Sequence, residues 1–298
     1  MRGDWPGTGR FNSALPLPPR MEERVVPGEV DQDRFDRSRR VGWIDLEAVF
    51  RSRVLVVGAG ALGNEVAKCL ALSGFRRITV VDMDHVVGSN LNRCLFFSGE
   101  DARAGSSKAE SVARGVERLS PDTRARAIVG RIEQLPGQFY EGFDVVLGCL
   151  DNIAARVHAN SHAYLARRPY IDGGMEGLTG KVMVCLPPDG PCIQCGMNKS
   201  HAKVAGMRFS CTGEGVVFHE PRLAAEITTT SIVSAVMVRE CLKVVSGRMD
   251  MVLRNTFYYD GQRNVAEELE VPLDPRCPNH PSDVLQVSEN HITSGSVQ

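Results

Sequence analysis

The sequence lacks the charge asymmetry of a protein that attracts nucleic acids or anionic membranes through its overall field. It has 35 Lys and Arg residues against 36 Asp and Glu residues, which gives a formal net charge of -1 over 298 residues. A balanced chain exerts no long-range attraction on a polyanion, so an anionic partner has to be recognised by a local patch. We therefore expect neither nucleic acid nor membrane as a partner.

The sequence also lacks the features of a secreted, disulfide-bonded protein. Its nine cysteines are an uneven count, several of them lie inside apolar runs, and no apolar signal segment stands near the first residue. Secreted frameworks usually combine paired cysteines with such a signal. These absences predict a reducing, cytoplasmic compartment.

A long uncharged apolar run is missing as well. Only residues 223–245 are long and apolar enough to raise the question of a membrane span, but they include Glu226, Arg239, Glu240 and Lys243. Charged side chains are costly in the hydrocarbon core of a bilayer. We interpret the segment as a buried amphipathic helix.

The two ends of the chain differ in composition from its middle. Residues 1–20 contain four prolines and little periodicity, which predicts a disordered extension, and the polar residues 281–298 predict a flexible tail. Residues 21–280 are expected to form one domain. Within it, residues 31–50 combine arginines with apolar residues at helical spacing, which indicates either a basic amphipathic helix or a solvated charged face.

Strand-like and helix-like segments alternate from Arg53 onward, a pattern typical of a mainly parallel sheet with helices on both faces. Later strand-like segments follow one another without helices and indicate antiparallel strands. The expected fold class is α/β, a Rossmann-like doubly wound, mainly parallel sheet extended by antiparallel strands. The expected strands are 53–57, 77–82, 124–129, 144–148, 169–172, 181–186, 251–259 and 264–271, and the expected helices are 61–73, 107–119 and 152–167.

A glycine-rich turn follows the first of these strands. The run VLVVGAGALG ends an apolar strand with Gly58, Gly60 and Gly63, and Asp82 ends the next strand 19 residues later. Glycines at this spacing let backbone amides approach a phosphate, and an acid at the second strand end can accept hydrogen bonds from ribose hydroxyls. The pattern predicts a nucleotide site, with NAD still possible; the alternative is a tight turn that serves packing alone.

Polar and basic residues shortly after Asp82 favour a nucleotide with a longer string of phosphates. Asn90, Asn92, Arg93 and Lys108 supply amide, guanidinium and ammonium groups that compensate concentrated negative charge. Each of these residue types, taken singly, is more often found on an ordinary surface.

A further acid follows the apolar strand VVLGCL. Asp151 is expected at the carboxyl edge of the sheet, where ligands bind and where Mg²⁺ could be held between protein and phosphates. The alternative role for Asp151 is to cap the helix that starts near Asn152.

Two pairs of metal-ligand type stand far apart in the sequence. Cys192 and Cys195 form a C-x-x-C motif, and Cys277 and His280 repeat the same inner spacing 82 residues after Cys195. Three thiolates and one imidazole can close a tetrahedral structural zinc site. Free thiols or a redox pair are the alternatives.

The remaining cysteines divide into two groups. Four lie in apolar helix or strand patterns and are expected in the core, namely Cys69, Cys149, Cys185 and Cys241. Cys94 is ambiguous. Cys211 lies in the irregular residues 196–221, a long connection of the kind that is often functional, and periodicity does not assign it to the core.

Taken in order, the motifs GAGALG, DMD, SNLNR, a lysine before a helix, LDN, IDGGMEG and CIQC resemble the ubiquitin-activating E1 superfamily over residues 50–280. Within it, the chain looks most like the catalytic subunits that activate the ubiquitin-like protein NEDD8, in a compact form. The bacterial adenylyltransferases of molybdopterin and thiamine synthesis share the nucleotide motifs, but IDGGMEGLTGKV and FSCTG look closer to the eukaryotic type.

The resemblance implies a role for each residue of the nucleotide motifs. Asp82 would hold the ribose, Asn90, Arg93 and Lys108 would contact the phosphates of ATP, and Asp151 would position Mg²⁺. In this superfamily the C-terminal glycine carboxylate of a small β-grasp protein attacks ATP between the α and β phosphates. Positioning and charge neutralisation supply most of such catalysis.

The chain departs from the family pattern at a few positions. Cys94 stands where the family usually has Gln, and the interval from Arg93 to Lys108 is longer than in the NEDD8-type pattern. The segment RFDRS resembles an N-terminal family motif whose second arginine reaches the ATP of a partner subunit. Arg37 is the residue at that position, and the resemblance therefore implies a homodimer.

The resemblance also implies a nucleophile. Cys211, followed by Thr as in the NEDD8-type subunits, would take the acyl group from the adenylate as a thioester for delivery to an E2 conjugating enzyme. One alternative is a sulfur-carrier adenylyltransferase in which Cys211 is not an obligatory carrier. The others are an NAD-dependent oxidoreductase and a non-catalytic E1-like subunit.

Overall fold

The structure, a computed structural model, describes residues 33–188, 190–197 and 224–280, and the chain divides into two compact units, residues 1–42 and 43–298. The described part of the first unit contains the short helix α1 (Asp36–Arg39). There the Asp33 carboxylate accepts hydrogen bonds from the Phe35 amide at 2.8 Å and from Arg39 Nη1 at 2.7 Å.

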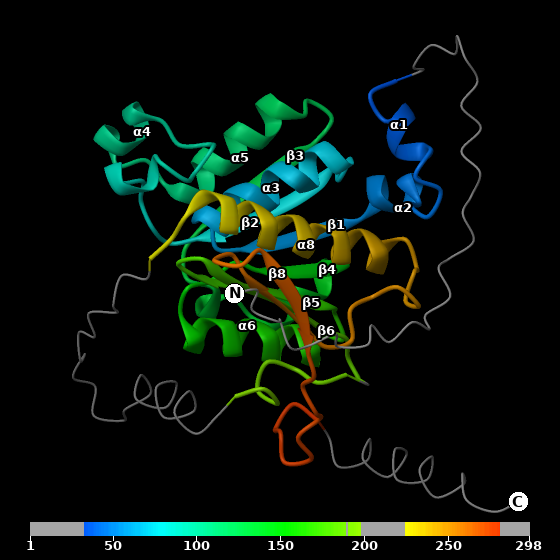
Figure 1. The fold of residues 1–298 in the computed structure, drawn as a ribbon. Coiled ribbons are helices and arrows are strands. Elements are labelled where there is room, and N and C mark those ends of the chain that lie inside the picture. The colour runs from blue at the N-terminus through cyan, green and yellow to red at the C-terminus, as the bar shows by residue number, and fades with distance from the viewer. Residues whose placement is uncertain (1–32, 189, 198–223, 281–298) are drawn as a thin grey trace, which may run out of the picture. The chain divides into compact units, whose positions relative to one another are not determined.

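The second unit is built around an eight-stranded sheet in the order β3-β2-β1-β4-β5-β6-β7-β8 (Figure 1). The five strands from β3 to β5 run parallel, and the pairs from β5 to β8 are antiparallel. The predicted fold class is confirmed. The strands are β1 (Arg53–Val57), β2 (Arg77–Asp82), β3 (Arg124–Val129), β4 (Val145–Gly148), β5 (Tyr170–Glu176), β6 (Thr179–Cys185), β7 (Thr256–Asp260) and β8 (Val265–Leu269).

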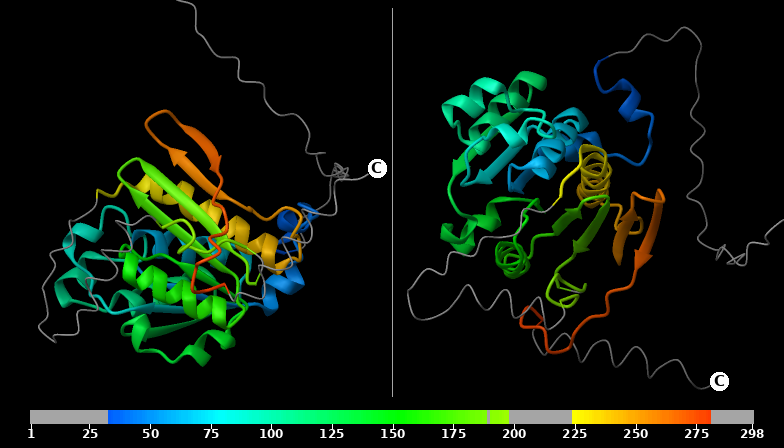
Figure 2. Two further views of the ribbon diagram at one scale, coloured as in Figure 1. Left: turned by 90° about the horizontal axis from the view of Figure 1, so that it is seen from below. Right: turned by 60° about the vertical axis from the view of Figure 1, so that its left-hand side comes forward.

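Helices cover both faces of the sheet, as Figures 1 and 2 show. Helices α3 (Ala61–Ser73), α5 (Lys108–Leu119) and α8 (Ile227–Val245) lie on one face, and α6 (Ile153–Leu165) lies on the other. The remaining short elements are α2 (Leu46–Arg51), α4 (Gly99–Ala104), η1 (Gly88–Asn90), η2 (Ile132–Gln134) and η3 (Gly137–Gly142). Among the described residues, no helix has both the length and the apolarity that a bilayer crossing requires.

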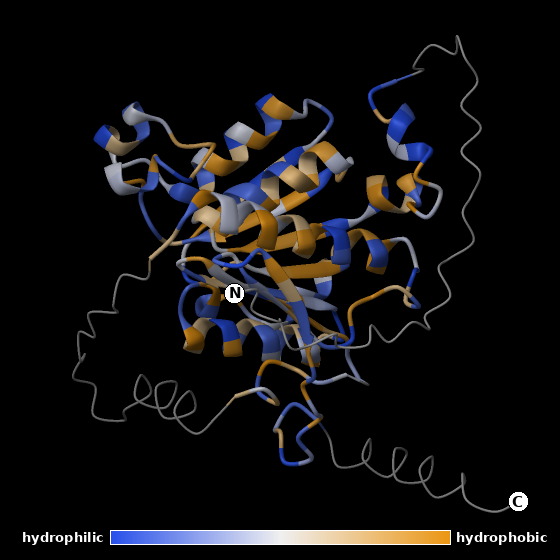
Figure 3. Cartoon of the chain, in the orientation of Figure 1, coloured by the Kyte–Doolittle hydropathy of each residue, from blue (hydrophilic) through white to orange (hydrophobic). Residues whose placement is uncertain are grey.

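The central strands consist mostly of apolar residues, as the hydropathy colouring in Figure 3 shows. In β1, Val54 and Val56 pack into the core beneath α3 and α8, whereas Leu55 and Val57 pack toward α6, and all four are at most 1% exposed. A strand buried on both faces reads as a continuous apolar run, which is why β1 could be recognised from the sequence.

The basic segment 31–50 differs from the single helix that its spacing suggested. Two short helices, α1 and α2, take its place. Gly42 adopts φ +76° between them, and the Asp45 carboxylate caps α2 by accepting a hydrogen bond from the Ala48 amide at 2.9 Å. A left-handed glycine followed by a new N-cap ends one helix and starts another.

The expected strand 251–259 was wrong at its beginning, since β7 starts only at Thr256. The Leu253 amide donates instead to the buried carboxylate of Glu240 in α8, at 2.8 Å. The sequence reading also missed α4, although its signals are present: Ser98 and Asp101 form a capping box and Gly105 ends the helix in a left-handed conformation.

Candidate functional site

The glycine-rich turn joins β1 to α3 and uses its three glycines differently. Gly58 has φ +99°, and a Cβ there would lie 2.5 Å from the carbonyl oxygen of Cys149. A Cβ at Gly63 would lie 2.0 Å from the carbonyl oxygen of Gly58, whereas nothing lies within 4 Å of a Cβ at Gly60. Gly58 and Gly63 therefore serve close packing, and Gly60 leaves the N-terminus of α3 open for a ligand.

This difference predicts opposite results for two alanine substitutions. Gly63→Ala should lower the free energy of unfolding by about 3 kcal/mol, because the new methyl group overlaps a backbone oxygen that cannot move freely. Gly60→Ala should leave the melting temperature nearly unchanged and weaken ATP binding, since its methyl group occupies the open space. Thermal denaturation and calorimetric ATP titration measure the two effects, and a fully stable Gly63→Ala variant would contradict this packing.

Asp82 at the end of β2 ties this turn to the neighbouring strand. One carboxylate oxygen accepts a hydrogen bond from the Ala59 amide at 2.6 Å, and the other accepts one from the Asp84 amide at 2.7 Å. Burial raises the pKa of Asp82, and the two amide hydrogen bonds oppose that shift. Each oxygen keeps a further lone pair, so the carboxylate can also accept hydrogen bonds from ribose hydroxyls.

Lys108 stands at the start of α5, beside the same strand end. Its Nζ lies 2.9 Å from the Asp84 carboxylate, and its amide donates to the Asp84 carbonyl at 3.0 Å. Ser107 caps the helix. An ammonium group and a helix N-terminus together favour anion binding next to Asp82.

The segment after β2 carries Asn90 and Arg93. The Asn90 side chain is 8% exposed, and its oxygen accepts a hydrogen bond from the Val87 amide at 3.1 Å, so it shapes the turn that precedes Arg93. The Arg93 guanidinium donates to the Ser89 carbonyl at 2.5 Å and to the Asn92 side chain at 3.0 Å. It remains half-buried at the surface.

Asn64 was not singled out from the sequence, although it connects these parts. Its side chain is fully buried, and its Nδ2 donates to the carbonyls of Ala59 at 2.9 Å and Gly60 at 3.0 Å. Its Oδ1 accepts a hydrogen bond from the Phe96 amide at 2.9 Å. One amide thus fixes the glycine-rich turn against the segment that carries Arg93. A single asparagine one turn into a helix gives no pattern by which it could have been found.

Asp151 follows β4 and is exposed. The cap of α6 is Asn152, whose Oδ1 accepts a hydrogen bond from the Ala155 amide at 2.9 Å, so the alternative of Asp151 as that cap is wrong. Asp151 is two residues from Cys149, whose carbonyl lies against Gly58. Asp151 is therefore at the same edge of the sheet as the glycine-rich turn. Its carboxylate makes no hydrogen bond or ion pair with any of the described residues.

A buried ion pair between α6 and β5 was also missed. Arg156 in α6 donates to both carboxylate oxygens of Asp172 in β5, at 3.1 and 2.5 Å, and to the Gly173 carbonyl at 2.9 Å. The Tyr170 hydroxyl also lies 3.3 Å from Asp172. The pair fixes α6 to β5, and it could not be read from residues that are 16 positions apart.

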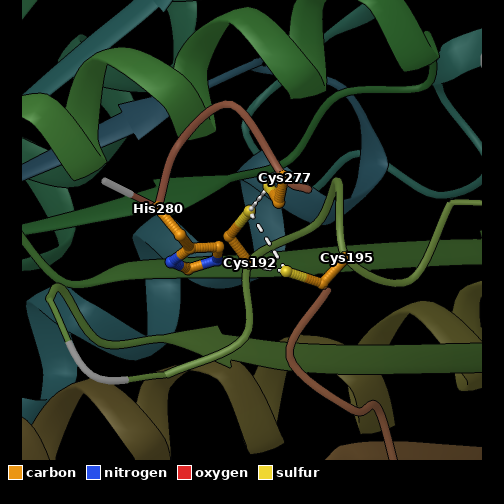
Figure 4. A group of neighbouring side chains, drawn as sticks. All are labelled: Cys192, Cys195, Cys277 and His280. Carbon is orange, nitrogen blue, oxygen red and sulfur yellow. Dashed lines mark hydrogen bonds between the residues drawn. The ribbon is translucent and has the colours of Figure 1, made fainter. Parts of the chain in front are cut away.

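The four predicted metal ligands meet in one cluster (Figure 4). Their donor atoms all lie within 4.8 Å of one another. The Cys192 sulfur is 4.0 Å from that of Cys195 and 3.5 Å from that of Cys277, and the Cys195 sulfur is 3.1 Å from Nε2 of His280. Two thiolates on a tetrahedral zinc ion lie about 3.8 Å apart, so the donor set and its size fit zinc.

Groups around the cluster favour the forms of the His280 imidazole and the Cys192 thiol that bind a metal ion. The Tyr164 hydroxyl donates to the Pro188 carbonyl and lies 2.8 Å from Nδ1 of His280. The imidazole therefore carries its proton on Nδ1 and turns the unprotonated Nε2 toward the sulfurs, as metal ligation requires. A hydrogen bond from Cys195 lowers the pKa of Cys192, which favours the thiolate form that a metal ion binds.

The cluster lies away from the nucleotide residues. Tyr164 is near the last turn of α6, whereas Asp151 precedes its first turn. Thirteen helical residues span about 20 Å. A metal ion at this distance from the glycine-rich turn has a structural rather than a catalytic position.

The other cysteines behave as expected where the structure describes them. Cys149, Cys185 and Cys241 are buried and Cys69 is half-buried. Cys94, which the sequence left ambiguous, is buried, and burial raises its pKa to about 11, so it is not a thiolate at neutral pH. Cys211 and almost all of the predicted loop 196–221 lie outside the described residues. Arg37 is exposed in α1 of the first unit.

Comparison with known proteins agrees with this arrangement. Residues 35–279 match the ThiF family. The chain belongs to the ThiF family. The sulfur carrier protein adenylyltransferase of Thermus thermophilus is 31% identical over 255 residues, 83% of this chain and 89% of that protein. The NEDD8-activating enzyme E1 catalytic subunit of Schizosaccharomyces pombe is 34% identical over 165 residues, 54% of this chain and 37% of that protein.

These relatives confirm the predicted resemblance of this ThiF-family chain to the E1 superfamily. The chain spans well under half the length of the first curated relatives, 37% of the yeast subunit and 26% of the SUMO-activating enzyme subunit uba-2 of Caenorhabditis elegans. Among solved structures, Escherichia coli MccB matches 86% of this chain and 77% of its own with a TM-score of 0.68 at 18% identity, which shows a shared fold.

Proposed function

We propose that this ThiF-family chain is an E1-like activating enzyme that adenylates the C-terminal glycine of a ubiquitin-like protein with ATP and Mg²⁺. The observation that carries the proposal is the meeting of the open Gly60 turn, Asp82 and Lys108 at one sheet edge, with Asp151 shortly after the adjoining strand β4. Asp82 would hold the ribose, and Lys108 would exchange its bond to Asp84 for one to a phosphate.

Asn90, Arg93 and Asp151 complete the proposed site. Arg93 would neutralise phosphate charge, Asn90 would place its segment, and Asp151 would hold Mg²⁺ through carboxylate oxygens, which Mg²⁺ prefers. The substrate carboxylate attacks the α-phosphorus of ATP, an acyl–phosphate bond forms, and pyrophosphate leaves. Arg37 of a second copy would add positive charge to the leaving group in a homodimer.

The second step of the proposal uses Cys211. Its thiolate attacks the acyl carbon of the adenylate, a thioester forms, and AMP leaves with the electron pair of the broken bond. The thioester would then pass to an E2 conjugating enzyme in a reducing, cytoplasmic compartment. None of the eight described cysteines is in a disulfide, which supports a reducing environment.

The second candidate is a sulfur-carrier adenylyltransferase, in which the adenylate goes to sulfur transfer and Cys211 is dispensable. It is favoured by the Thermus thermophilus relative, which matches over 89% of its length. Both candidates share the adenylation site and differ in the fate of the adenylate. The structural zinc ion proposed for Cys192, Cys195, Cys277 and His280 is compatible with either.

Cys211→Ala separates the two candidates. With ATP, Mg²⁺ and a β-grasp protein ending in Gly-Gly, the wild-type chain should form an adduct on a non-reducing gel that a thiol reagent removes. Cys211→Ala should lose the adduct completely and keep its ATP–pyrophosphate exchange, because the nucleotide residues are unchanged. Cys69→Ser is the matched control and should keep both. An exchange-competent wild type without any adduct would favour the sulfur-carrier function.

A further inference from the structure

Four exposed arginines lie on one corner of the sheet, at the edge opposite the nucleotide residues. Arg53, Arg77 and Arg124 are paired in register across β1, β2 and β3. Arg126 follows two residues after Arg124 and is in register with Thr79 of β2. Residues in register, and residues two apart on one strand, share a face of the sheet. All four side chains therefore project from the same face; we call them the arginine corner.

No helix among the described residues covers the arginine corner, because of the sheet order. It lies on the face that α6 packs against, but the strands that α6 contacts most are β4 and β5, on the far side of β1. All four arginines are exposed. A hollow of about 380 Å³ adjoins two of them, Arg53 and Arg77, and its other lining residues are Ala48, Arg51, Ser52 and Asp144.

The charges of the arginine corner are not balanced by ion pairs within the described residues. No salt bridge there includes any of the four arginines. The Arg77 guanidinium donates a hydrogen bond to the Arg51 carbonyl at 3.4 Å. The nearby Asp144 carboxylate accepts a hydrogen bond from the backbone amide of Arg53 at 2.7 Å and forms no salt bridge with its guanidinium. In-register residues of neighbouring strands lie about 4.8 Å apart, so three like charges in a row destabilise the sheet. An anion that bridges them would remove this repulsion.

We propose that the arginine corner docks an acidic segment of a partner protein, with its Asp and Glu carboxylates bound by the guanidinium groups. Guanidinium groups bind carboxylates in bidentate geometry, and the row places several of them side by side, so one acidic segment can engage more than one of them. The residues that line the hollow include no aromatic side chain on which a nucleic acid base could stack. The net charge of -1 supplies no general attraction for a polyanion.

The position of the arginine corner keeps it apart from the nucleotide site. Arg53 begins β1, and Gly58 follows its end, so the two are about 17 Å apart along five strand residues. Partner and nucleotide can therefore bind at the same time. The inference does not depend on the proposed function, because the arginine corner shares no residue with the adenylation site.

Binding of a fluorescent peptide of alternating glutamate and serine to the full chain tests the proposal, measured by anisotropy at low salt. Arg77→Glu combined with Arg124→Glu should weaken binding tenfold or more, because two attractive contacts become repulsive. Arg254→Glu, an exposed arginine before β7, is the matched control and should bind as the wild type does. Saturating ATP should not change the affinity.

The melting temperature of the double variant shows whether a loss of peptide binding comes from misfolding. The double variant turns the repulsion between residues 53 and 77 into an attraction and keeps one like-charge pair, residues 77 and 124, so it should be at least as stable as the wild type. Its ATP–pyrophosphate exchange should be unchanged. The proposal would be overturned by the absence of saturable peptide binding or by an equal loss in Arg254→Glu. Tighter binding of single-stranded oligo-dT, or of phosphatidylserine vesicles, than of the peptide would overturn it as well.

Discussion

Asp151→Asn should lower ATP–pyrophosphate exchange by roughly 100-fold or more and leave the fold intact. A carboxylate that holds a metal ion against phosphates stabilises charge that develops in the transition state, and an amide of the same shape does not replace it. The side chain is exposed, and Asn152 rather than Asp151 caps α6. The free energy of unfolding should therefore change by no more than about 1 kcal/mol, the value of a charge near a helix N-terminus.

The control for this substitution is Glu141→Gln, which removes an exposed carboxylate on η3. It should retain full exchange activity. A high residual activity of Asp151→Asn at saturating Mg²⁺ would assign the metal to other residues. If both variants lost activity equally, the effect would come from the overall charge and the proposed role of Asp151 would be wrong.

Removal of zinc should lower the melting temperature by roughly 10 °C or more, since the binding free energy of a structural zinc ion is available only to the folded chain. Cys192 and Cys277 are buried and come from segments 85 residues apart, so the ion would cross-link the connection after β6 to the segment that follows β8. Purified protein should contain one zinc ion per chain by elemental analysis. Cys277→Ser should reproduce the effect of a strong chelator.

Two observations separate this structural role from others. Cys69→Ser changes a half-buried cysteine outside the cluster and should keep both the zinc ion and the melting temperature. After zinc is removed, the protein that remains folded should keep the same rate of ATP–pyrophosphate exchange per chain, because the cluster lies about 20 Å along α6 from Asp151. Protein isolated without zinc, with Cys192 and Cys195 joined in a disulfide, would instead indicate a redox pair.

The positions of the residues in the predicted nucleotide motifs were largely readable from the sequence. Gly58 to Gly63, Asp82 and Lys108 lie at strand ends and helix starts, which local periodicity locates well, and parallel strands bring such ends to one edge. The sequence could not decide whether Asp151 caps α6, because Asp151 and Asn152 are adjacent and both residue types are common N-caps. Only the hydrogen bond from Ala155 to Asn152 leaves Asp151 available for a ligand.

The sequence by itself determined the alternation of strands and helices, the glycine-rich turn and the ligand set of the metal cluster. These features depend on residue type and short spacing, so neighbouring residues encode them. The tertiary structure alone decided that Asn64 joins the turn to the segment of Arg93, that the metal cluster is remote from the nucleotide edge, and that the arginine corner exists. Each of these depends on strand order and register, which bring together residues that are distant in the sequence.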